Sequence, residues 1–76
     1  MAGSATNSRL LKAYLALREV SRKELGRALN RSASAIHRKL NGKTEFTASE
    51  IQACVDLLNL DMDTAKIIFF AGEVYQ

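Results

Sequence analysis

Two short helical segments joined by only two residues constrain the fold of this chain more than any other feature. The first segment begins at Ser21 and the second near Ser32, and only Asn30 and Arg31 lie between them. A connection this short does not allow the two helices to stack antiparallel along their lengths, so they are expected to cross steeply. Asn30 suits the bend because asparagine tolerates a positive φ better than most residues.

Gly26 lies inside the first of these segments. A glycine in a helix interior costs about 1 kcal/mol relative to alanine, so its presence indicates a close approach by a neighbouring segment. The segment begins with "SRKE", a capping box in which Ser21 and Glu24 each bind the backbone N–H of the other. Its expected inward stripe consists of Leu25, Ala28 and Leu29.

Three more helices are expected around this pair. One spans about residues 8–18, one begins with a second capping box, "TASE" at residues 47–50, and the last is capped by Asp61 or Asp63. Phe46, in the loop before "TASE", is expected to anchor in the core. The apolar positions expected to face inward on the first two of these helices are Leu11, Leu15, Ile51, Cys54, Val55 and Leu58. The predicted fold class is therefore all-α, a compact bundle of about five short helices.

A chain of 76 residues has room for one domain, expected to span residues 8–76 after a flexible N-terminal arm of residues 1–7. No stretch approaches the roughly 18 apolar residues that cross a bilayer, so no membrane segment is expected. The single Cys54 cannot form an internal disulfide, which suits a reducing cytoplasm. The chain has one histidine and one cysteine, and it lacks a carboxylate pair and a phosphate-binding glycine loop. We therefore expect that the protein is not an enzyme and that it binds no metal, cofactor or small-molecule substrate.

Charge is divided unevenly along the chain. Residues 1–46 carry ten lysine or arginine residues against three glutamates, a net charge of +7, whereas residues 47–76 carry one lysine against five acidic residues, a net charge of −4. A basic half joined to an acidic half indicates a polyanionic partner for one face of the molecule.

The segment from about residue 32 to residue 41 has two stripes. Ala33, Ile36 and Leu40 are expected on the core side. The other stripe recurs at positions i, i+3, i+4 and i+7, and its members are Ser34, His37, Arg38 and Asn41. Such side chains suit base edges in a DNA major groove, and a guanidinium such as that of Arg38 can bridge O6 and N7 of guanine. The alternative is the ordinary solvated face of an amphipathic helix, but no acidic residue occurs from residue 30 to residue 44.

Residues 11–60 resemble the helix-turn-helix repressors of bacteria and phages of the Cro and lambda-repressor type. The resemblance is carried by "VSRKELGRALN", "SAIHRKLNGK" and "TASEIQACVDLLNL". It places the motif at about residues 21–41 and the DNA-recognition helix at about residues 32–41. The sequence departs from the pattern at Asn30 and at Glu19, where many members have glycine, and at Arg31, where they have an aliphatic residue.

The resemblance also implies contacts, position by position. The residues implied to touch bases are Ser32, Ala33, Ser34, His37 and Arg38. Those implied to lie near phosphates are Arg22, Lys23, Asn41, Lys43 and Thr44, to which Arg31 is added because an arginine there must turn its head outward.

The expected function is sequence-specific binding of double-stranded DNA by a transcriptional regulator, most simply a repressor, in the cytoplasm of a bacterial cell and associated with its nucleoid. A homodimer on a pseudo-palindromic operator is expected, with a dimer surface built from Ile68, Phe69, Val74 and Tyr75. The alternative for these residues is that the tail closes the core of the monomer. The alternative function is a protein-interaction module, similar to an antitoxin or antirepressor, that uses the acidic and apolar C-terminal part.

Overall fold

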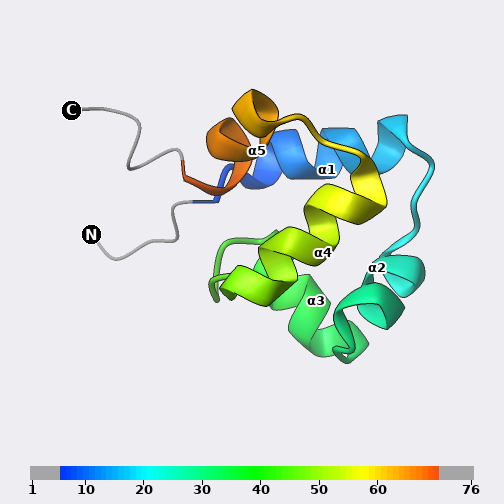
Figure 1. The fold of residues 1–76 in the computed structure, drawn as a ribbon. Helices are drawn as coiled ribbons and strands as arrows, with labels where there is room; N and C mark the ends of the chain where they lie inside the picture. Colours follow the sequence, from blue (N-terminus) through cyan, green and yellow to red (C-terminus); the bar gives the residue numbers. More distant parts are fainter. Residues whose placement is uncertain (1–5, 71–76) are drawn as a thin grey trace.

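Five helices make up residues 6–70, the part of the chain that the computed structural model describes (Figure 1). They are α1 (Ser8–Leu17), α2 (Arg22–Leu29), α3 (Ala33–Leu40), α4 (Ala48–Leu58) and α5 (Met62–Phe69). Between residues 6 and 70 there is no strand, so the all-α prediction is confirmed. Helix α2 packs against both α3 and α4, while α1 contacts α3 and α5. No helix in this range is long and apolar enough to cross a membrane.

Each of the five helices begins at a polar residue whose side chain accepts a hydrogen bond from a backbone N–H of the first turn. These N-cap residues are Asn7, Ser21, Ser32, Thr47 and Asp61. Both predicted capping boxes are present, and Asp61 rather than Asp63 caps α5. The backbone N–H of Asn7 also donates to the carbonyl of Ile68. This hydrogen bond links the residue before α1 to α5.

The core is built from the apolar stripes of all five helices together with Phe46 of the α3–α4 loop. Its fully buried side chains include Leu11, Leu25, Ile36, Leu40, Cys54, Leu58 and Ile68. Burial raises the pKa of the Cys54 thiol to about 12, as suits a small core residue. Two expectations about inward faces are wrong: Ala28 and Ala33 are exposed, and their helices bury Gly26 and Lys39 instead.

Helix α5 closes the core of the monomer. Ile68 is 0% exposed and Phe69 is 3% exposed, and the Phe69 ring meets the Phe46 ring edge to face at 5.4 Å between centroids. The expectation that Ile68 and Phe69 form a dimer surface is therefore wrong, because both side chains are already enclosed by their own chain. Val74 and Tyr75 lie outside the described residues.

Among residues 6–70, three residues other than glycine adopt the left-handed backbone conformation, at the ends of α1, α2 and α4. They are Glu19, Asn30 and Asn59, with φ of 57°, 57° and 53°. Asparagine accepts this conformation readily, which confirms the expectation for Asn30, whereas glutamate pays a steric cost of about 1–2 kcal/mol. Gly42 has φ of 77° and ends α3 as the sequence predicted.

A buried carboxylate joins the α2–α3 turn, α3 and α4. Glu50 is 3% exposed; its Oε1 accepts hydrogen bonds from the Thr47 N–H at 2.9 Å and lies 3.0 Å from Lys39 Nζ. Its Oε2 lies 2.6 Å from Arg31 Nε, an ion pair whose N–H is not aligned for a hydrogen bond. Lys39 is buried as well, and it also donates to the carbonyl of Glu45 at 3.0 Å. Opposite charges are thus paired where water cannot solvate them.

Burial by itself raises the pKa of Glu50, but its hydrogen bonds from Thr47 and Lys39, with the charges of Lys39 and Arg31, outweigh this effect. The net result is a pKa below the usual value for glutamate. The pKa values of Glu24 and Asp61 are also lowered, in both cases by the backbone and side-chain hydrogen bonds of their helix caps. All three carboxylates are therefore stabilised in their ionised forms by the fold.

Replacing Glu19 by glycine is expected to raise the free energy of unfolding by about 0.5–1 kcal/mol. The substitution removes a left-handed strain of about 1–2 kcal/mol, and the greater freedom of glycine in the unfolded chain returns part of that gain. Urea denaturation measures the change. Ala13→Gly, at an exposed position in the middle of α1, is the control and should lose about 1 kcal/mol, since glycine is unfavourable in a helix interior. A loss with Glu19→Gly would contradict the strain argument.

Acid should weaken the fold through these carboxylates. A carboxylate with a lowered pKa in the folded state adds stability that is complete above its unfolded pKa, near 4.3 for glutamate, and that is lost as pH falls through the folded value. We therefore expect the free energy of unfolding to decrease as pH falls below about 4.

Glu50→Gln should lose about 3–5 kcal/mol at neutral pH, because Lys39 is left buried without a counter-charge, and its acid dependence should be shallower. The control is Glu45→Gln, which removes an exposed carboxylate near the same site. Equal losses in the two variants, measured by urea denaturation across the pH range, would show that the buried ion pair does not stabilise the fold.

Candidate nucleic-acid interface

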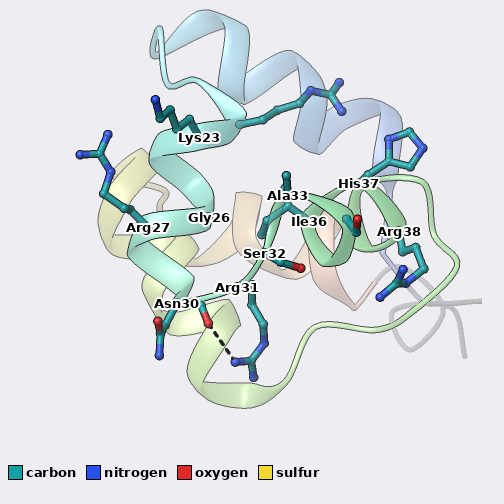
Figure 2. Close-up of a pocket in the computed structure, with 12 residues that line it drawn as sticks. Lys23, Gly26, Arg27, Asn30, Arg31, Ser32, Ala33, Ile36, His37 and Arg38 are labelled. Atoms are coloured by element: carbon teal, nitrogen blue, oxygen red, sulfur yellow. Dashed lines mark hydrogen bonds between the residues drawn. The ribbon is translucent and has the colours of Figure 1, made fainter.

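Gly26 marks the contact between α2 and the turn that follows it. An added Cβ at this position would lie 3.0 Å from the Arg31 carbonyl oxygen and 3.6 Å from Cγ1 of Ile36. The Arg31 N–H in turn donates to the Gly26 carbonyl at 2.9 Å. The expected close approach at Gly26 is therefore confirmed, and it sets how near α3 lies to α2 (Figure 2).

An open groove of about 1110 Å³ lies between α2 and α3 (Figure 2). Among the described residues, its lining includes no acidic side chain and five lysine or arginine side chains: Arg22, Lys23, Arg27, Arg31 and Arg38. All five expected base-contacting residues line it, as do three of the expected phosphate-contacting residues, Arg22, Lys23 and Arg31. Asn41, Lys43 and Thr44 do not line the groove. Arg27 was not predicted, although its i+4 spacing from Lys23 on α2 already placed the two on one face.

The first turn of α3 presents small side chains to the groove. The Ser32 hydroxyl caps the helix by accepting from the Ala35 N–H at 3.2 Å, while Ala33 and Ser34 are exposed. One turn further along, Arg38 is exposed, and its side chain makes no hydrogen bond or ion pair with another residue in the range 6–70. In Figure 2 its guanidinium extends away from the helix. The front of α3 is thus unobstructed at its start and carries an unpaired cation near its end.

His37 and Asn41 are connected to α1 by a chain of exposed contacts. Lys12 Nζ donates to Asn41 Oδ1 at 2.8 Å, and Asn41 Nδ2 lies 3.1 Å from one ring nitrogen of His37 and 3.4 Å from the other. A lysine ammonium only donates, so this contact turns the Asn41 amide nitrogen toward the imidazole. Sequence reasoning did not assign Lys12 to the site, because nothing in the local pattern relates α1 to the end of α3.

Arg31 lies at the edge of the groove rather than fully extended into solvent. Its side chain is 42% exposed, its Nε pairs with Glu50, and its Nη1 donates to the Asn30 carbonyl at 3.2 Å, the dashed line in Figure 2. Sequence reasoning missed the roles of Glu50 and Lys39. The local signal for Lys39 was weak, because at 100° per residue position 39 falls about 60° from Ile36 and about 100° from Leu40, at the border of the buried face.

Comparison with known proteins agrees with this geometry. A family model described as a helix-turn-helix domain matches residues 8–66, from the start of α1 into α5. Comparisons with curated proteins and with solved structures gave no significant match. The match spans most of the chain and includes both helices of the groove and the turn between them, and the chain therefore belongs to the helix-turn-helix domain family of DNA-binding proteins.

Proposed function

We propose that this protein is a sequence-specific regulator of transcription of the Cro and lambda-repressor type, in which α3 enters the major groove of double-stranded DNA. The observation that carries the proposal is the groove beside α3, which is lined by five basic side chains and no acidic one while the outer face of α3 remains exposed. A major groove about 12 Å wide admits an α-helix, and its flanking phosphates supply the complementary charge.

The residues divide into two roles under this proposal. Arg22, Lys23 and Arg31, with Asn41, Lys43 and Thr44 beyond the end of the groove, contact phosphates and set the orientation of the protein on the duplex. Base edges are read from α3 by Ser32, Ala33, Ser34, His37 and Arg38. Arg38 is the strongest reader because its guanidinium is unpaired and can bind guanine O6 and N7 together.

Repression from a homodimer is part of the proposal, with half-sites about 34 Å apart on a pseudo-palindromic operator. The dimer contact must exclude Ile68 and Phe69, because both are enclosed in the monomer. Of the large apolar side chains in the described part of the chain, Leu17, Met62 and Ile67 are exposed instead. The protein would act in the bacterial cytoplasm on the nucleoid, without catalysis.

Salt dependence provides the first test. If the four basic residues assigned to phosphates, Arg22, Lys23, Arg31 and Lys43, each neutralise one phosphate, log affinity should fall against log salt concentration with a slope of about −3 to −4. Fluorescence anisotropy with duplexes selected from a random pool gives this slope, and a scrambled duplex gives the specificity ratio. A flat response to salt, or equal affinity for selected and scrambled duplexes at physiological salt, would overturn the proposal.

Arg38→Ala should cost about 1–3 kcal/mol of binding free energy and relax the preference at one base pair, because a bidentate contact to a base is lost. Selection from the random pool, repeated with the variant, identifies that position. Lys66→Ala is the matched control: it also removes one exposed positive charge, but from α5, which does not line the groove. If both variants change affinity equally at every site, Arg38 acts only through its charge.

A further inference from the structure

The buried carboxylate of Glu50 is paired with two cationic side chains, one more than is required to neutralise its charge. Its single negative charge faces two positive charges, at 3.0 Å from Lys39 and 2.6 Å from Arg31, so the cluster keeps one net positive charge. The three side chains differ in exposure: 3% for Glu50, 10% for Lys39 and 42% for Arg31. The surplus charge therefore reaches solvent through Arg31, at the edge of the basic groove.

Lys39 is fully occupied inside the protein. Its ammonium contacts Glu50 and donates to the Glu45 carbonyl at 3.0 Å, and it lies 5.7 Å from the centroid of the Phe46 ring. An ammonium has three N–H donors and no acceptor, so these contacts leave it little capacity for an outside ligand. Lys39 thus serves to balance the charge of Glu50, not to bind a partner.

Arg31 keeps free donors in a fixed position. A guanidinium has five N–H groups; one of them donates to the Asn30 carbonyl, and Nε is held by the ion pair with Glu50 without donating a hydrogen bond to it. The others have no partner among residues 6–70. Because Nε and one Nη are both held, the plane of the guanidinium is set before any ligand arrives. A planar donor fork held in this way suits the oxygens of a phosphate.

We propose that Glu50 is a positioning residue for DNA binding: it orients the Arg31 guanidinium so that its free N–H groups contact a backbone phosphate, while Lys39 cancels the charge of the carboxylate. Without Lys39 the carboxylate would repel the phosphate that Arg31 binds. An arginine that is already ordered loses less side-chain freedom on binding, a gain of about two- to tenfold in affinity. This inference rests on the proposed function and assigns a role to a residue that does not touch DNA.

The test is a coupling measurement on DNA affinity, with a fluorescein-labelled duplex selected from the random pool as the probe. In the parent, Arg31→Ala should lower affinity about tenfold and reduce the magnitude of the salt slope by about 1. The same substitution is then measured in a second protein that carries Lys39→Met and Glu50→Gln. This double substitution removes one charge of each sign and so keeps the net charge. That background should bind more weakly than the parent by about two- to tenfold, and in it Arg31→Ala should cost less than about threefold.

Arg31→Lys provides a second arm in which the Lys39–Glu50 pair stays intact, so that the result does not depend on whether the double substitution folds. Lysine keeps the charge, but its single ammonium cannot hold Glu50 and present a planar fork to a phosphate together. We expect a loss of about threefold or more in affinity with little change in the salt slope. Circular dichroism confirms that each variant is folded, and Lys66→Ala should match the parent.

Two results overturn the inference. One is an equal cost of Arg31→Ala in both backgrounds, which would mean that Glu50 does not position Arg31. The other is a parental affinity and salt slope in Arg31→Lys, which would mean that charge alone matters. If the unsubstituted protein binds the duplex without salt dependence, the proposed function fails as well. If its binding depends on salt but Arg31→Ala costs the same in both backgrounds, only the positioning role of Glu50 is excluded.

Discussion

The pairing of the Glu50 carboxylate is the interaction on which the geometry of the groove depends. A buried charge costs several kcal/mol unless it is matched by opposite charge and hydrogen bonds. The partners of Glu50 come from the turn after α2, from α3 and from the start of α4. The carboxylate is satisfied only when these segments are assembled together, so its burial ties the position of α3 to that of α4. On the other side, the absence of a side chain at Gly26 sets how near α3 and the turn before it can lie to α2.

The same cluster explains how the molecule keeps its positive charge on one face. Two basic residues of the motif face an acidic residue of the C-terminal half, but only the lysine is enclosed with it. The arginine remains at the groove, where it joins four other basic side chains. Five of the ten basic residues in the N-terminal part of the chain are thus brought together at the groove. Long-range attraction of a polyanion toward this face follows from that arrangement.

Helix α5 illustrates why an apolar run does not by itself reveal an interface. Four consecutive apolar residues, 67–70, exceed what one helix face can bury, and the sequence allowed either a dimer surface or closure of the core. In the structure Ile68 and Phe69 fill the core and Ile67 faces solvent at 49% exposure. The distinction arises because Phe46 and α1 supply the apolar partners that a lone helix would otherwise seek in a second chain.

The sequence by itself determined where the helices begin and how the α2–α3 turn is made, and it identified the residues at the start of α3 that line the groove. Caps and turns are interactions between residues a few positions apart. Both partners of each interaction can therefore be identified in one short stretch of sequence. Tertiary structure alone decided that Lys39 is buried, that Arg31 pairs with Glu50, that Lys12 reaches Asn41, and that Ala28 and Ala33 are exposed. Each of these depends on which distant segment packs over a given helix face. Local periodicity gives the direction of a side chain, but the charge or apolar surface that meets it comes from another part of the chain.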